Sequence, residues 1–188
     1  MYFIIIVLGF VCVALIISLL NTESKERQNI ARAAFNWTGI GVYNGPTKVG
    51  HEMKSYYPIR SVQHLCGRKE KLSKSKVDIT SANPDDNEIE QKAVLFFVEN
   101  GDFCLRRLDQ PVVWITDERR ENVYVLKDSE TTVSEIPKGL RSKNNPDSKF
   151  NELENDVIVL NMGDNILIGQ TLFEYNSKEK IYGKIRKE

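Results

Sequence analysis

Apolar residues fill the start of the chain without interruption. Residues 2–20 read YFIIIVLGFVCVALIISLL and contain no charged side chain. At a rise of about 1.5 Å per residue, a helix of this length reaches roughly 28 Å, close to the ~30 Å hydrocarbon core of a bilayer. No basic residue precedes the run and no small-x-small cleavage site accompanies it, which disfavours a cleaved signal peptide. The pattern therefore predicts an uncleaved transmembrane helix over residues 1–21.

The charges beside this run predict its orientation. Lys25, Arg27 and Arg32 follow the apolar residues at a short distance, whereas no basic residue precedes them. Basic residues near a membrane helix favour the cytoplasmic side. We therefore expect a single-pass protein of the cell membrane whose remaining residues are cytoplasmic.

Residues 23–35 are polar and then helix-prone, and they either extend the membrane helix or form a short juxtamembrane helix. Residues 36–50 read NWTGIGVYNGPTKVG and contain four glycines and a proline. Glycine and proline at this density are typical of irregular connections. The sequence therefore predicts a juxtamembrane segment and linker over residues 22–53, leading to a domain over residues 54–188.

Short apolar runs separated by turn residues characterise the rest of the chain. The clearest is KAVLFFVENGDFCLRRL at residues 92–108, where an Asn-Gly turn joins strands over 93–98 and 103–108. Asn-Gly between two such runs is the strongest short signal for a hairpin. Further strands are predicted at 56–68, 76–81, 112–116, 122–127, 156–161, 165–170 and 171–176, with an extra one at 180–186. Many short strands without a long periodic helix predict an all-β sandwich.

A long polar stretch interrupts the strands at about residues 128–155. Loops of this length are uncommon inside compact domains, so the stretch is either a functional insertion or mobile. Its serines and threonines lie among acidic residues, as in substrates of protein kinases. A solvated loop is the interpretation that we favour.

Charge and cysteine usage exclude several classes of function. The chain has 26 basic and 26 acidic residues, and this balance disfavours a nucleic-acid binder driven by bulk charge. Cys66 and Cys104 each lie in an apolar run without metal-ligand spacing, which predicts two reduced, buried thiols. His51 and His64 are isolated, and His64 is expected at a surface or sheet edge. No nucleophile elbow, phosphate loop or zinc motif is present, so we expect no enzyme activity, metal, cofactor or small-molecule substrate.

The closing stretch LNMGDNILIGQTLFEY, residues 160–175, resembles the end of a forkhead-associated (FHA) domain. The matching positions are Leu160, Gly163, Asp164, Ile166, Ile168, Gly169, Phe173 and Tyr175. Upstream, YPIRSVQHLCGRKE is similar to the family's apolar-x-Gly-Arg segment, with the pair at Gly67 and Arg68. The short strand at 77–79 and the hairpin at 92–108 follow in the family's order, so the resemblance covers about residues 54–176.

The resemblance implies an eleven-stranded β-sandwich, preceded here by the transmembrane helix, with binding loops at one end. Its usual function is to dock phosphothreonine peptides, because an arginine fork and hydroxyl or backbone N–H donors suit a phosphate dianion. Arg68 matches the family's phosphate-contacting arginine, and Gly67 its turn glycine. Gly67, Gly163, Asp164 and Gly169 are the structural motif residues that carry over.

The binding residues of the family carry over poorly. Its Ser-x-x-His-Ala falls on residues 89–93, where only the alanine survives and Ile89 replaces the serine. Its Asn-Gly-Thr loop falls between Leu108 and Trp114, where the asparagine is missing. The pocket is therefore expected to be degenerate. The remaining candidate contacts for a phosphopeptide are Arg68, Lys69, Asn87 and Gln110.

Two functions follow as hypotheses. In the first, the chain is a membrane-anchored cytoplasmic adaptor whose FHA-like domain recruits a phosphoprotein, in signalling or cell-envelope assembly. In the second, it is a constitutive structural subunit of a membrane complex, and its FHA-like domain binds a protein partner independently of phosphorylation. The lost serine and asparagine favour the second, and Arg68 favours the first.

Overall fold

The computed structural model describes residues 12, 13, 15–20, 22, 25, 35, 37–68, 86–142, 149–177, 179 and 180. The strand expected at 76–81, Lys69, and all but Lys180 of the strand expected at 180–186 lie outside these residues. Over the residues that are described, no helix is both long and apolar enough to cross a membrane. The transmembrane helix therefore stays a prediction from the sequence.

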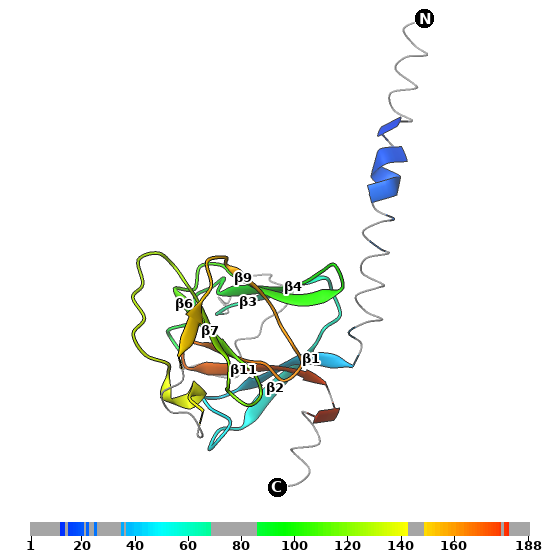
Figure 1. Ribbon diagram of the computed structural model, residues 1–188. Helices are drawn as coiled ribbons and strands as arrows, with labels where there is room; N and C mark the ends of the chain where they lie inside the picture. The colour runs from blue at the N-terminus through cyan, green and yellow to red at the C-terminus, as the bar shows by residue number, and fades with distance from the viewer. Residues whose placement is uncertain are drawn as a thin grey trace, which may run out of the picture.

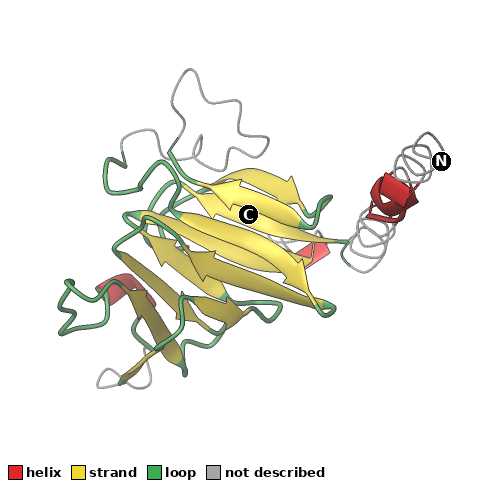
Figure 2. Ribbon diagram, turned by 90° about the horizontal axis from the view of Figure 1, so that it is seen from above, coloured by secondary structure: helices red, strands yellow, loops and turns green. Residues whose placement is uncertain are grey.

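Eleven strands in two sheets make up the described part of the domain. They are β1 (Thr38–Tyr43), β2 (Met53–Pro58), β3 (Gln63–Cys66), β4 (Val94–Glu99), β5 (Asp102–Arg107), β6 (Val112–Thr116), β7 (Val123–Lys127), β8 (Phe150–Glu152), β9 (Val157–Val159), β10 (Asn165–Ile168) and β11 (Thr171–Ser177). The larger sheet has the order β2-β1-β11-β10-β6-β7-β8, and the smaller one β3-β4-β5-β9. Figures 1 and 2 show how the strands are arranged in space. The prediction of an all-β sandwich is confirmed.

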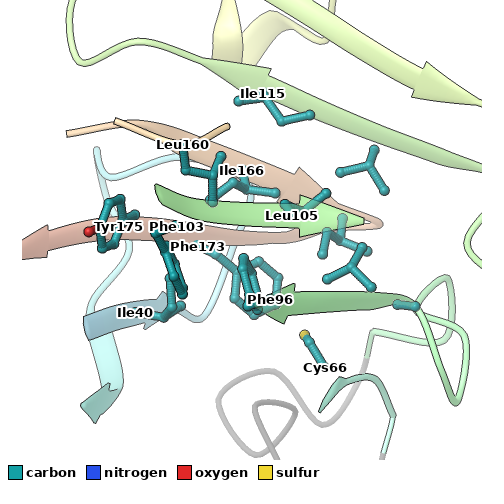
Figure 3. Close-up of a cluster of buried hydrophobic side chains, with 14 of the residues drawn as sticks. Ile40, Cys66, Phe96, Phe103, Leu105, Ile115, Leu160, Ile166, Phe173 and Tyr175 are labelled. Carbon is teal, nitrogen blue, oxygen red and sulfur yellow. The ribbon is translucent and has the colours of Figure 1, made fainter. Parts of the chain in front are cut away.

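Alternation along the strands builds the core between the two sheets. Ile166 of β10 and Phe173 of β11 face inward, and Phe96 and Phe103 face them from the smaller sheet (Figure 3). Ile168 of β10 belongs to the same buried cluster. The rings of Phe96 and Phe103 stack with centroids 5.8 Å apart. Burial of such aromatic and branched side chains is the main favourable term in folding. The core thus fixes the two sheets face to face.

The two cysteines of the domain contribute to this core. Cys66 and Cys104 are both buried and both carry free thiols, as the sequence predicts. Burial, followed by the charges of Glu99 and Asp102, raises the pKa of the Cys104 thiol. A thiol with a raised pKa is a poor nucleophile. These cysteines therefore act as small core residues.

The β4–β5 hairpin forms where the Asn-Gly signal predicts it. Asn100 and Gly101 both have positive φ angles, 52° and 91°. Two central residues with positive φ are typical of the turn that matches strand twist in tight hairpins. The register runs from Val94 opposite Arg107 to Glu99 opposite Asp102.

The prediction of a linker over residues 36–50 is wrong, because this segment contains β1. This strand lies inside the larger sheet between β2 and β11, so the sandwich begins near residue 38 rather than 54. Gly39 shows why the glycines of residues 36–50 do not mark an irregular linker. A Cβ atom there would lie 2.5 Å from the ring of Tyr56, so the position needs glycine for close packing. Phe35, just before β1, is buried with its ring 5.8 Å from that of Phe103.

The single strand predicted over residues 56–68 is also corrected. It is two strands in different sheets, β2 and β3, joined by a corner at residues 59–62. Ile59 is buried at this corner. His64 is buried in β3 instead of lying at the surface, and its Nε2 accepts a hydrogen bond from Ser61 N at 3.3 Å. Burial lowers the pKa of His64.

The polar stretch after β7 packs on the outer face of the larger sheet. Ile136 and Leu140 belong to a second buried cluster, together with Trp114, Leu167 and Leu172 of the larger sheet. The apolar residues next to these three in their strands point to the opposite face of the sheet and belong to the main core. A short 3₁₀ helix, Lys138–Leu140, carries Leu140, and β8 adds to β7 in parallel. The favoured interpretation of a solvated loop is therefore wrong for residues 133–142, while residues 143–148 lie outside the description.

Candidate functional site

The register of the strands gathers the predicted binding loops at one end of the sandwich. Cys66 at the end of β3 lies opposite Val94, and Ile168 at the end of β10 lies opposite both Val113 and Thr171. We call this end, formed by residues 67–68, 86–93, 108–111 and 169–171, the loop end. The chain enters β1 at the other end, where Thr38 pairs with Ser177 of β11.

Gly67 and Arg68 lie at the loop end, against the segment that leads into β4. The backbone N–H of Arg68 donates to the carbonyl of Glu90 at 2.8 Å. A Cβ atom on Gly67 would lie 1.8 Å from the carbonyl oxygen of Gln91, so only glycine lets the two segments cross. The side chain of Arg68 is exposed, and no described residue pairs with its guanidinium.

Gln110 lies where the resemblance places an asparagine, and its side chain is buried. Its Nε2 donates to the carbonyl of Glu88 at 3.0 Å, and its Oε1 accepts from the backbone N–H of Glu90 at 3.0 Å. Both polar atoms of the amide are therefore bonded within the chain. Through these two hydrogen bonds, Gln110 connects the β5–β6 turn to the backbone of residues 88–90.

Asp86 completes this arrangement and was missed by sequence reasoning. Its buried carboxylate accepts bonds from the Thr171 hydroxyl at 2.6 Å and from Gln170 N at 2.8 Å through Oδ2, and from Glu88 N at 3.1 Å through Oδ1. Gly169, with φ of 55°, brings the β10–β11 turn against it. The signal that could have found Asp86 is its place before Asn-Glu, since an aspartate often bonds the backbone two residues on.

The remaining candidate positions include the exposed charges of the described part of the loop end. Ile89, at the place of the family's serine, is a core residue and 3% exposed. Asn87 is exposed beside it. The exposed charged residues of the described loop end are Arg68, Lys92, Glu88, Glu90 and Asp109. Among these described residues, three carboxylates outnumber two cations, and this balance of charge disfavours the binding of a phosphate dianion.

Gly163 and Asp164 lie at the opposite end of β10 from Gly169. Gly163 N donates to the carbonyl of Tyr175 at 2.7 Å, and the Asp164 carboxylate accepts from Asn161 N at 2.8 Å. Burial, against the bond from Asn161 and with the charge of Asp117, raises the pKa of Asp164 to about 6. Two residues of the structural motif, Gly67 and Gly169, thus lie at the loop end, whereas Gly163 and Asp164 lie at the opposite end of the sandwich.

Replacing Gln110 with alanine is expected to lower the free energy of unfolding by about 1–3 kcal/mol, because the buried N–H of Glu90 and the carbonyl of Glu88 both lose their partner. Chemical denaturation of the full chain in detergent micelles measures this. Gln63→Ala, at an exposed position in β3, is the matched control and is expected to stay within about 0.5 kcal/mol of the wild type. Equal effects of the two changes would contradict the role given to Gln110.

Asp164→Asn is expected to stabilise the protein at neutral pH. The folded pKa of about 6 lies above the ordinary value of 3.8, so the folded state holds the proton where the unfolded state has lost it. Stability then falls as the pH rises through this window, by up to about 3 kcal/mol. The variant should gain stability at pH above about 7 and match the wild type near about pH 3.5. Denaturation curves at both pH values test this, and a variant less stable than the wild type at neutral pH would refute it.

Comparisons with known proteins add a set of distant structural likenesses. No family model matches the sequence, and no curated protein does. Over the part of the chain that the structure describes, no group of three or more histidine, cysteine or acidic side chains could hold a metal ion.

Three of the similar solved structures are described here. The FHA domain of the CT664 protein from Chlamydia trachomatis is 8% identical, with a TM-score of 0.42, covering 74% of this chain and 97% of its own. The FHA domain of human APLF, in complex with an XRCC1 bisphospho peptide, is 12% identical, with a TM-score of 0.42, covering 73% and 98%. The yeast Pml1 splicing factor is 12% identical, with a TM-score of 0.44, covering 74% and 78%. All three likenesses are distant in both sequence and geometry.

Proposed function

We propose that the chain is a membrane-anchored, FHA-like adaptor whose loop end binds a protein partner without reading phosphothreonine. The observation that carries this proposal is the Gln110 side chain, which bonds Glu88 and Glu90 through both of its polar atoms. Gln110 is 4% exposed and its amide is turned toward the chain's own backbone, so it is poorly placed to hold the backbone of a bound peptide. The partner would be held constitutively, as in a structural subunit of a membrane complex.

The neighbouring side chains support the same function. Asp86 joins residues 86–88 to the β10–β11 turn, so the loops are held before any partner arrives. A preorganised surface binds with a smaller loss of conformational entropy. Among the described residues of this surface, the carboxylates of Glu88, Glu90 and Asp109 outnumber the cations of Arg68 and Lys92, which suits a partner with basic residues.

The anchor in this proposal is the apolar run over residues 2–20, with the domain on the cytoplasmic side. The loop end lies at the end of the sandwich away from Phe35 and Thr38, where the chain enters β1. A domain tethered through its entry end leaves the opposite end open to partners in solution. This arrangement suits an adaptor.

Phosphopeptide docking is the second candidate function, and Arg68 is the observation that favours it. Its guanidinium is exposed at the loop end, next to the backbone bond from its own N–H to Glu90. An arginine fork is the preferred side chain for a phosphate. In this alternative, the partner would be a phosphoprotein in signalling or cell-envelope assembly.

Two exchanges at the loop end separate the candidates. Partner capture by the solubilised full chain is expected to survive Arg68→Ala and to fall at least about tenfold in Glu90→Arg, which reverses a charge on the binding surface. Arg119→Ala, in the β6–β7 turn at the other end, is the matched control. Loss of capture in Arg68→Ala with retention in Glu90→Arg would favour phosphopeptide docking instead.

A further inference from the structure

A cavity of about 320 Å³ opens between the two sheets, at the end away from the loop end. Its walls are mostly apolar and come from both sheets: Ile115 of β6 and Tyr124 of β7 on one side, Ile158 of β9 on the other, and Leu153 after β8. We call it the side cavity. It lies where β9 forms the edge of the smaller sheet and β8 the edge of the larger one.

Two carboxylates line the side cavity. Asp117, after β6, is held in place by bonds from Glu121 N at 2.9 Å and from Asn122 N and Nδ2 at 3.1 and 2.9 Å. Asp164 is 8% exposed, and its Oδ2 accepts the bond from Asn161 N. No described residue donates to Asp164 Oδ1, and no described basic side chain pairs with either carboxylate. Asp164, whose Oδ2 is bonded to Asn161 N and whose Oδ1 faces no described donor, therefore borders the side cavity.

The buried carboxylate of Asp164, with Asp117 beside it, favours the binding of a cation. Buried charge is costly unless it is paired, and two nearby carboxylates repel each other. For Asp117, burial raises the pKa but the bonds from Glu121, Asn122 and Arg120 together lower it, so its charge is offset within the chain. For Asp164, burial and then the charge of Asp117 raise the pKa, and the bond from Asn161 N offsets them only in part. A positive group placed between the two acids would offset the rest.

We infer that the side cavity is a binding site for the side chain of a lysine or arginine from a protein partner. These side chains combine an apolar stem with a charged head, so the stem can lie along Ile115, Tyr124 and Ile158 while the head meets Asp117 and Asp164. A neutral apolar side chain would fill the walls and leave the acids unpaired. A phosphate-bearing group would bring a charge of the wrong sign.

The edge of the sheet beside the cavity offers a place for the partner's backbone. In the described part of the smaller sheet β9 pairs only with β5, and Val159 at its end is 49% exposed. An extended segment can add to such an edge and direct alternate side chains inward. This site is separate from the loop end, so it stands whether or not the loop end reads phosphate.

The test uses small probes on the isotope-labelled full chain in non-ionic micelles, near pH 7.5, above the pKa of Asp164. Nα-acetyl-lysine methylamide is titrated and its contacts are followed by NMR shifts at Tyr124 and Ile158. The norleucine analogue, which lacks the ammonium group, and phosphocholine are the comparison probes. We expect saturable shifts with the lysine probe and at least about tenfold weaker binding of the other two.

Asp164→Asn is the decisive variant, because asparagine keeps the acceptor for Asn161 N and removes only the charge. It is expected to weaken binding of the lysine probe by about tenfold or more, whereas Glu130→Gln, at an exposed position after β7, leaves it unchanged. No saturable shift at the cavity would overturn the inference, as would equal binding of norleucine or no effect of Asp164→Asn. Tighter binding of phosphocholine than of the lysine probe would also overturn it, in favour of a lipid headgroup.

Discussion

Replacing Leu140 with alanine is expected to lower the free energy of unfolding by about 2–5 kcal/mol. Leu140 is 1% exposed and packs with Ile136, Leu167 and Leu172 on the outer face of the larger sheet. Truncation would remove its apolar burial and leave a cavity under the short 3₁₀ helix. Chemical denaturation of the full chain in micelles measures the loss.

Ser134→Ala is the control for this prediction, because Ser134 is exposed in the same polar stretch. It is expected to change the free energy of unfolding by less than about 0.5 kcal/mol. If Leu140→Ala were as mild as Ser134→Ala, the stretch would be a solvated loop after all, and the second buried cluster would lose its support.

Lys48→Met is expected to cost about 3 kcal/mol of stability at neutral pH, because it removes a cation that forms an ion pair with a buried carboxylate. Lys48 Nζ lies 2.9 Å from Glu174 Oε2, and the Glu174 side chain is 1% exposed. Tyr43 and Asn176 also donate to this carboxylate, at 2.7 and 2.9 Å. Burial alone would raise the pKa of Glu174, but Lys48 and these donors together lower it.

A double exchange separates the charge from the packing. Adding Glu174→Gln to Lys48→Met should recover most of the loss, since an amide oxygen can still accept from Tyr43 and Asn176 without carrying charge. The gap between wild type and Lys48→Met should also narrow as the pH falls below the ordinary value of 4.5, where protonation neutralises Glu174.

Lys54→Met is the matched control for this pair. Lys54 bonds Glu52 on the surface, where the two side chains are 44% and 78% exposed. Exposed pairs of this kind contribute little to stability. A loss in Lys48→Met no larger than in Lys54→Met would show that residues 44–50 do not belong to the folded domain.

The sequence predicted correctly those parts of the fold that depend on residues close together in the chain. The β4–β5 hairpin follows from two apolar runs around Asn100 and Gly101, and the β10–β11 pair from alternation around Gly169. β1 was missed because its glycines serve close packing against Tyr56, which is contributed by another strand. Leu140 was missed because a few apolar residues spaced through a polar stretch give no period.

The candidate site also has one part that the sequence predicted and one part that it did not. The order of motifs placed Gly67, Arg68 and Gln110 in neighbouring loops, and the structure brings these residues to one end. The bonds of Gln110 and Asp86 depend on where three separate loops meet, which no local pattern encodes. The side cavity likewise forms between β7 and β9, which are distant in the sequence.

The central claim is that the loop end holds its protein partner without phosphate. The most direct test is to capture the partner with the full chain from solubilised membranes, before and after phosphatase treatment of those membranes. The account predicts equal capture in both samples, and equal loss from both with Glu90→Arg. A loss of about tenfold or more on phosphatase treatment, matched by the loss in Arg68→Ala, would contradict it.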